Sequence, residues 1–415
     1  MKSIKLDSAI LFALVIPFIM GVSIGSGETP YGLFALIFLC MLVYVSLDIF
    51  SLRKSLYEKT KIVLLWVIIL TVIGSAFSAA IVKRHITAPI YNVHDIVLQQ
   101  ESAIRFFLDG KNPYATTYFS TPLVDWQYSD TEINPALYHF VMEPFYLLFA
   151  LPFYFLSNHT LGYFDGRIPL VFLFLGLLLS AHFLVKDQDK KRLFLVLLAF
   201  NPAVLPYTLE GRSDLFMYPF LFLGFFLLYK KKLLLAGIPL ALAFAVKQSA
   251  WPLMPFYIAY LYFQTKSWKQ VAQSLLIFIG LFAVVVLPFF FWDQKAFIDS
   301  TINYLSGSTV HSYPISGYGF GRVLNELNVI KDLHGFYPFQ WWQLGVGLPF
   351  LGILLRLYRK NPTTKIMILF YALFLMVYWY FSRYFHNSHL SYISMVIITA
   401  YFWPDDESIQ KERKR

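Results

Sequence analysis

The residues best suited to chemistry lie in a polar, acid-bearing segment, residues 91–118, of a chain that is otherwise strongly apolar. Apolar residues make up 58% of the chain and charged residues only 14%, so a charged segment between apolar runs is where polar chemistry can take place. Asp95 is its central acid. A carboxylate held at a membrane edge could act as a general base on a hydroxyl group. The alternative is an ordinary solvated helix face, in which Asp95 only complements the helix dipole.

Cations in two later stretches of the chain could hold a phosphate. Arg212 and Asp214 lie in a polar turn between two apolar runs; Asp214 is expected to cap the helix that follows, and Arg212 could face the phosphate. Lys247 ends another apolar run and is followed by Gln248. Lys247 could simply extend to the membrane surface, but we favour a fixed cation that binds a lipid phosphate and stabilises its departure.

Polar side chains also gather between the last two apolar runs, where the residues are Arg383, His386, Asn387 and His389. The two histidines have metal-like i, i+3 spacing, but two histidines without a clear third ligand are weak evidence for zinc. Hydrogen bonding to phosphate or sugar is therefore favoured. The loop 292–337 contains Arg322 among several glycines and could close over a substrate. Its GYGFG stretch is not a dinucleotide-binding motif because no Rossmann strand precedes it.

The element expected to position Asp95 is an amphipathic helix over residues 94–109. Its polar residues, which include His94 and Glu101, fall on one broad face and most of its apolar residues on the other. Gly110 has the place of a C-cap glycine. Such a helix is predicted to lie in the membrane interface.

The rest of the sequence predicts an all-α, polytopic membrane protein with a single domain over residues 1–415. A bilayer-spanning helix needs about 20 apolar residues, and roughly twelve runs qualify. The runs are 9–27, 31–50, 62–82, 168–185, 193–208, 214–229, 233–249, 251–263, 271–291, 338–356, 365–381 and 388–403. We interpret the first run as a retained span rather than a signal peptide. The single cysteine, Cys40, excludes an internal disulfide. The net charge of +10 does not indicate nucleic-acid binding, because Lys and Arg lie mainly in short loops.

The basic loops should all face the cytoplasm, and they can do so only if one apolar run fails to cross. The run 136–157 is the weakest candidate because Pro144 and Pro152 interrupt it and Glu143 lies inside it. We predict a re-entrant or surface-lying segment, which is tolerated where protein covers its backbone. Both termini then face the cytoplasm, and the loop 83–167 and the clusters described above face the outside.

The loops used in this argument are 53–61, 186–192, 230–232, 266–269, 356–365 and the tail 411–415. Lys83, Arg84 and His85 are exceptions, since they would begin an outer loop. There they could lie near a phosphate.

Taken together, these segments resemble the GT-C glycosyltransferases. They look closest to the branch that contains the enzyme adding the first mannose to GPI anchors and its bacterial polyprenyl-phosphate-mannose relatives. The motifs are an acidic helix with a Gly-x-x-Pro-Tyr turn, two Asn-Pro steps, a Gly/Arg/Asp turn, a span ending in Lys near a Pro, and a late Phe-Ser-Arg cluster. In this chain they are Asp95, Gly110, Pro113, Tyr114, Asn134, Pro135, Asn201, Pro202, Gly211, Arg212, Asp214, Lys247, Pro252 and Phe381 to His389.

The resemblance implies inverting transfer of a sugar, mannose above others, from a polyprenyl- or dolichyl-phosphate donor on the non-cytoplasmic face of the cell membrane. It also implies that Asp95 is catalytic. We assign the donor phosphate to Arg212, Lys247 and Arg383. Substrate binding is assigned to His94, Glu101, Tyr114, Asp214, Gln248, Arg322, His386, Asn387 and His389. The acceptor, whether lipid, glycan or protein, is left open.

One departure from the resemblance concerns metal. The GPI enzyme has an Asp-x-Asp pair where this chain has only Asp95 preceded by His94. No metal ligands are therefore assigned, and a divalent ion, Mg²⁺ or Mn²⁺, stays open as a cofactor.

Two other functions are left open by the sequence. A transporter or flippase of a lipid-linked sugar would share the spans and the buried charges, but it should contain internal repeats, and the sequence shows none. A glycosyltransferase-like subunit without catalytic activity, which holds a partner enzyme, is the third interpretation.

Overall fold

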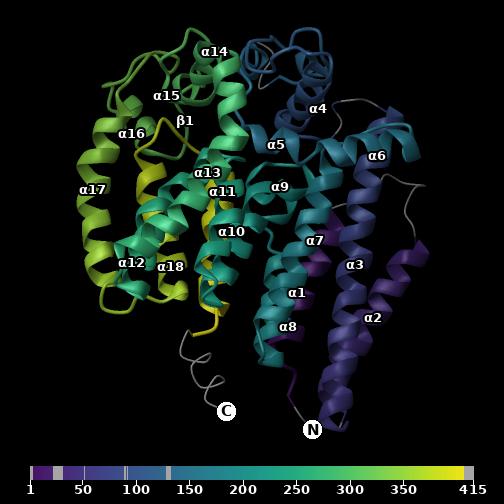
Figure 1. Cartoon of the computed structure of the whole chain (residues 1–415). Coiled ribbons are helices and arrows are strands. Elements are labelled where there is room, and N and C mark those ends of the chain that lie inside the picture. Colours follow the sequence, from purple (N-terminus) through teal and green to yellow (C-terminus); the bar gives the residue numbers. More distant parts are fainter. Residues whose placement is uncertain are drawn as a thin grey trace.

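The computed structural model describes residues 3–21, 31–50, 52–87, 90, 92–127 and 132–405, which form a bundle of helices (Figure 1). The predicted all-α class is confirmed, because the described residues are mostly helical and their strands are only two residues long. The longer helices are α1 Leu6–Gly21, α2 Tyr31–Ile49, α3 Lys54–Thr87, α4 Asp95–Leu108, α6 Leu151–Leu161, α7 Arg167–Leu184, α8 Gln188–Ala199, α10 Asp214–Tyr229, α11 Leu233–Phe244, α12 Met254–Thr265, α13 Trp268–Trp292, α17 Phe339–Tyr358, α18 Thr364–Tyr380 and α19 Asn387–Phe402.

Short helical turns connect these helices. They are η1 Pro122–Asp125, η2 Pro135–Leu137, α5 Pro144–Leu148, α9 Leu205–Leu209, η3 Gln248–Leu253, α14 Gln294–Ile298, η4 Asp299–Asn303, α15 Tyr304–Ser306 and α16 Phe320–Glu326. Two strands, β1 Ser316–Gly317 and β2 Tyr384–Phe385, pair in parallel. This pairing joins the loop before α16 to the segment between α18 and α19. Gly317 has φ +84°, and a Cβ there would lie 2.1 Å from the carbonyl oxygen of Phe385, so only glycine fits.

Four helices are long and apolar enough to cross a membrane: Tyr31–Ile49, Lys54–Thr87, Arg167–Leu184 and Trp268–Trp292. Shorter apolar helices accompany them, over Leu6–Ile19, Asp214–Tyr229, Leu233–Phe244 and Thr364–Tyr380. This supports a membrane protein but does not confirm about twelve spans. One reason is that several apolar runs are not continuous helices. The run 193–208, for example, is divided where α8 ends before Asn201-Pro202 and α9 begins at Leu205.

α3 is longer than the apolar run that predicted it, and one of its cations is not in a loop. Lys61 was expected in a basic loop, but it lies inside α3 and its side chain is fully buried. Its ammonium nitrogen lies 3.1 Å from Asp7 and 2.6 Å from Asp48. The loop assignment is wrong for Lys61, because buried carboxylates on α1 and α2 compensate its charge.

The same correction applies at the other end of α3. Arg84 was predicted to begin an outer loop, but it lies in the last helical turns of α3 and is buried. Its guanidinium donates to Glu101 at 2.7 Å and to Asp165 at 2.9 Å. Arg84 therefore connects α3 to α4 and to the start of α7, and both of its carboxylate partners are occupied by this contact.

The helix predicted over residues 94–109 is present as α4, and Gly110 follows it with φ +73°. Its surroundings differ from the prediction, because residues 95–104 are all buried. The Gln99 side chain donates to the backbone oxygens of Ala136 and His139, and Gln100 donates to that of Tyr146. The polar face therefore meets peptide carbonyls rather than water. Those carbonyls belong to the broken segment that follows, which lacks enough backbone partners of its own.

The segment 136–157 is broken into shorter helices, and its prolines predicted such an interruption. η2, α5 and α6 divide it, and Pro144 and Pro152 each lie in the first turn of a short helix, where the missing N–H costs nothing. In Figure 1, α5 and α6 lie toward the same end of the bundle as α4, the end that also carries α14 and α15. That the segment returns to its own side of the membrane stays a prediction.

Candidate functional site

A cavity of about 1440 Å³ lies among the start of α4, the turn before α10, η3, the loop before α16 and the segment after α18. Most of the predicted site residues line it, although they come from segments far apart in the sequence. These are His94, Asp95, Arg212, Asp214, Lys247, Gln248, Arg322, Arg383, His386, Asn387 and His389.

Two predicted substrate-binding residues, Glu101 and Tyr114, do not line the cavity. Glu101 is paired with Arg84 and also accepts from the backbone N–H of Gly166 at 2.9 Å. The buried hydroxyl of Tyr114 donates to the backbone oxygen of Met142 at 2.8 Å. Both contacts support the fold around α4.

Asp95 is the first residue of α4 and is 4% exposed. One carboxylate oxygen lies 2.6 Å from Nδ1 of His94, and the other accepts from the Asn134 side chain at 3.2 Å. The Ile96 backbone N–H lies 3.3 Å from the same His94 nitrogen. One Nδ1 cannot both donate to Asp95 and accept from Ile96, and the shorter contact favours donation to Asp95. His94 and Asn134 therefore fix the orientation of a carboxylate that faces the cavity.

Lys247 is held at a break between two helices. The helix α11 ends at Phe244, and its last carbonyls would lack partners where the chain turns away. The backbone N–H of Phe145 donates to the Ala245 oxygen at 2.8 Å, and that of Glu143 donates to the Val246 oxygen at 3.1 Å. The start of α5 thus satisfies the end of α11, and both helix ends are fixed beside Lys247.

The charge of Lys247 is shared with Asp214, because its Nζ lies 2.8 Å from an Asp214 carboxylate oxygen. The prediction that Asp214 caps the following helix is wrong. Asp214 is the first residue of α10, the N-cap position is Ser213, and no side chain forms the cap hydrogen bond. The carboxylate of Asp214 binds the lysine across the cavity wall instead.

The other two predicted phosphate ligands are also engaged. Arg212 stacks its guanidinium 4.5 Å from the centre of the Tyr207 ring and lies 3.2 Å from Glu210. Arg383 donates to the backbone oxygens of four loop residues: Tyr313, Leu333, His334 and Gly335. Arg383 therefore ties the loop 292–337 to the segment before α19.

Arg322 differs from these cations. It is half-buried on α16 and lines the cavity. Within the described ranges of the chain, its guanidinium forms no ion pair and no hydrogen bond. Arg322 is thus the cavity cation with the most freedom to bind an anion.

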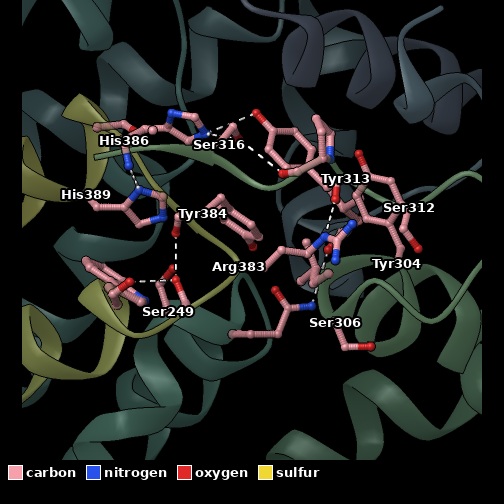
Figure 2. A pocket seen from close by; sticks show the side chains of 18 of the residues that line it. Ser249, Tyr304, Ser306, Ser312, Tyr313, Ser316, Arg383, Tyr384, His386 and His389 are labelled. Carbon is pink, nitrogen blue, oxygen red and sulfur yellow. Dashed lines mark hydrogen bonds between the residues drawn. The ribbon is translucent and has the colours of Figure 1, made fainter. Parts of the chain in front are cut away.

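His386 faces the loop that Arg383 holds. Its Nε2 lies 3.1 Å from the Ser316 hydroxyl and 3.3 Å from that of Tyr313, and Figure 2 shows the ring directed at both. Burial, together with the nearby charges of Arg212 and His94, lowers the pKa of His386 to about 4. His386 is therefore neutral near pH 7 and can exchange hydrogen bonds with hydroxyl groups.

The described residues of the cavity do not form a metal-ligand set. In the part of the chain that the structure describes, no three His, Cys, Asp or Glu side chains lie together in a way that could hold an ion. The backbone N–H of His386 donates to Nδ1 of His389 at 3.0 Å, so the lone pair of this nitrogen is occupied and cannot bind an ion. The pair serves as the N-terminal cap of α19.

Several cavity residues were not predicted from the sequence. Tyr138 and His311 stack with ring centres 3.6 Å apart and link the segment after α4 to the loop 292–337. Trp126 packs against His94 and donates to the backbone oxygen of Val93 at 2.8 Å. Their only signal in the sequence is that aromatic residues stand in polar loops, and aromatic residues are too common in this chain to single these out.

Residues 140–379 match the sequence model of Glycosyltransferase family 87. The match covers more than half of the chain, so the chain belongs to this family, which supports a GT-C-type glycosyltransferase. The matched range includes the cavity cations except Arg383, and it begins after Asp95. No curated protein matches the chain, and no solved structure matches it.

Proposed function

From this family membership we propose that the protein transfers a sugar, mannose above others, from a polyprenyl-phosphate donor to an acceptor hydroxyl on the non-cytoplasmic face, with inversion. The GPI mannosyltransferase branch suggests this donor and sugar. The proposal includes about twelve spans and two cytoplasmic termini in the cell membrane. The acceptor is a lipid, a glycan or a protein.

The observation that carries this proposal is one cavity with a carboxylate and cations on different walls. Asp95 is oriented by His94 and Asn134, while Arg322 and Lys247 belong to other segments that line the same cavity. An inverting transfer needs a base and a leaving-group site on opposite sides of the sugar. The cavity contains residues suited to both tasks.

The proposed reaction follows from these groups. The acceptor oxygen attacks the anomeric carbon while its proton moves to a carboxylate oxygen of Asp95. The bond between the anomeric carbon and the phosphate oxygen breaks, and the electron pair leaves with the lipid phosphate. Arg322, Lys247 and Arg212 stabilise the charge that develops on this phosphate.

A transporter or flippase of a lipid-linked sugar is the second candidate, because the same cavity could bind the donor without reacting. It predicts movement of the lipid with no new glycosidic bond. For a subunit without catalytic activity, we expect neither movement of the lipid nor a new glycosidic bond. Assaying the purified protein with several polyprenyl-phosphate sugars separates the three.

The decisive variant is Asp95→Asn, which keeps the size of the side chain but cannot accept the proton. General-base catalysis contributes about 10²–10⁴-fold, so transfer should fall by at least about 100-fold while donor binding persists. Asp109→Asn is the matched control, since Asp109 is exposed just beyond the end of α4. Full transferase activity in Asp95→Asn would contradict the mechanism.

A further inference from the structure

Glu143 is a buried acid for which the proposed reaction has no use. It is 1% exposed at the start of α5. Within the described residues it forms no ion pair, and its carboxyl group accepts one hydrogen bond, from the Gln248 side-chain nitrogen at 3.0 Å. A buried carboxylate without a cation is costly, so the neutral acid is favoured. Burial accordingly raises the pKa of Glu143 to about 8.

The Gln248 carboxamide is held by its nitrogen. Besides Glu143, the backbone oxygens of Val141 and Thr301 lie within hydrogen-bond distance of this nitrogen, each at 3.2 Å. Its two N–H groups are shared among these three acceptors, which fixes which end of the amide faces the cavity. The carboxamide oxygen accepts no hydrogen bond from any residue that the structure describes, and Gln248 lines the cavity. A hydrogen-bond acceptor is therefore presented to whatever the cavity contains.

Glu143 also supports the side of the cavity on which Lys247 lies. The backbone N–H of Glu143 binds the Val246 oxygen, directly before Lys247. Glu143 thus contacts the α11–η3 break through its backbone and, through its side chain, the glutamine that follows the lysine.

We propose that Glu143 is a positioning residue whose neutral carboxyl group orients Gln248, so that the Gln248 oxygen accepts a hydrogen bond from a hydroxyl of the transferred sugar. This inference rests on the proposed glycosyl transfer. Glu143 itself does not touch the substrate.

Among the residues that the structure describes, the groups around Glu143 supply no compensating positive charge. The phenol of Tyr114, on the segment after α4, faces it, and burial together with the Glu143 charge raises the pKa of Tyr114. Lys247, on the neighbouring break, directs its ammonium at Asp214. The η4 turn contributes the Thr301 carbonyl oxygen. Ionisation of Glu143 above about pH 8 places an uncompensated charge in this buried wall. We expect the wall then to open to water, so that Gln248 loses its orientation.

Four variants test the proposal: Glu143→Gln, Glu143→Ala, Gln248→Leu and the double variant Glu143→Ala/Gln248→Leu. Glu143→Gln mimics the neutral acid, so it should retain transfer and keep it above about pH 8, where the wild type loses it. Glu143→Ala should raise the KM for the donor or lower kcat by about tenfold. Adding Glu143→Ala to Gln248→Leu should lower transfer little further, because both changes remove the same interaction. Glu326→Gln, an exposed acid on α16, controls for the charge change.

A second readout does not depend on transfer. The pKa of Glu143 is raised from its ordinary value of 4.5 to about 8 in the folded protein. Between these two pH values the unfolded chain loses a proton that the folded protein keeps, so the wild type becomes less stable as the pH rises through this range. Glu143→Gln should lack this decline in unfolding experiments in detergent. An equal decline in both proteins would overturn the neutral carboxyl group. Loss of transfer in Glu143→Gln as large as in Glu143→Ala, or fully additive losses in the double variant, would overturn the positioning role.

The two proposals can fail separately. If the wild type transfers no sugar, both the proposed glycosyl transfer and the sugar contact of Gln248 are wrong. The comparison of unfolding between the wild type and Glu143→Gln still decides whether Glu143 is neutral. An active wild type with unaffected Glu143→Ala and Gln248→Leu variants overturns only the positioning role.

Discussion

The cations of the cavity differ in what they already bind, and this difference ranks their roles. Arg383 is bound to four backbone oxygens, Arg212 lies against Tyr207 and Glu210, and Lys247 is paired with Asp214. Arg322 has no such partner among the described residues. The sequence analysis assigned Arg212, Lys247 and Arg383 to the phosphate and Arg322 only to substrate binding, because a sequence shows that a charge is present but not what neutralises it.

Arg322→Ala should therefore weaken donor use more than Arg383→Ala does in the folded protein. A charge-assisted contact contributes about 1.5–3 kcal/mol, so kcat/KM for the donor should fall about tenfold or more. Steady-state kinetics with varied polyprenyl-phosphate sugar measure this. Lys331→Ala, which removes an exposed cation from the same loop, serves as the control. Unchanged kinetics in Arg322→Ala would exclude this residue from the phosphate site.

The Lys247–Asp214 pair leads to a non-additive prediction. Lys247→Ala removes a cation and also leaves the Asp214 carboxylate unpaired beside the incoming phosphate, so transfer should fall about tenfold or more. Adding Asp214→Asn should restore part of the loss, because it removes the repulsion. A double variant that is worse than Lys247→Ala would instead mean that Asp214 contacts the substrate directly. Transfer rates of the three variants at saturating acceptor distinguish these outcomes.

At the scale of elements, sequence patterns predicted where α4 lies but not what surrounds it. The periodicity placed a polar face over residues 94–109, and the same pattern would arise whether that face meets water or peptide carbonyls. The carbonyls that bind Gln99 and Gln100 come from the broken segment 136–157. A break in one element thus determines the burial of another, and a single-sequence pattern cannot contain that relation.

The broken segment gives a topological prediction. If residues 136–157 do not cross the membrane, Asn158 at the exposed end of α6 and Lys111 after α4 lie on the same side. Single cysteines at these two positions, in a Cys40→Ser background, should both react with a membrane-impermeant reagent from outside. Cys40 is buried, so its replacement removes background labelling at little risk to the fold. Labelling of position 158 only from the cytoplasmic side would show that the segment crosses.

At the scale of the whole molecule, the helices before residue 140 lie outside the family match, yet they carry Asp95. Two buried charge clusters on α3, separated by about 35 Å of helical rise, attach them to the matched part. Near one end, Lys61 binds Asp7, which also accepts from Arg192 on α8 at 2.9 Å. Near the other end, Arg84 binds Asp165 before α7. Residues from both parts form the cavity, so these clusters determine how its walls meet.

The clusters should differ in their effect on catalysis. Lys61→Met leaves Asp48 without its cation, and Arg84→Met does the same to Glu101. Breaking a buried pair in this way costs about 3–5 kcal/mol, so both variants should lower the unfolding temperature in detergent. Only Arg84→Met should also lower kcat in the fraction that stays folded, because Glu101, its partner, lies on the same helix as Asp95. Lys61 lies far from the cavity, and its variant should keep the wild-type kcat per folded molecule. A wild-type kcat in Arg84→Met would show that α4 holds Asp95 without this contact.

Glu101→Gln tests the original assignment of Glu101 to substrate binding. A raised donor KM in this variant at unchanged stability would support that assignment.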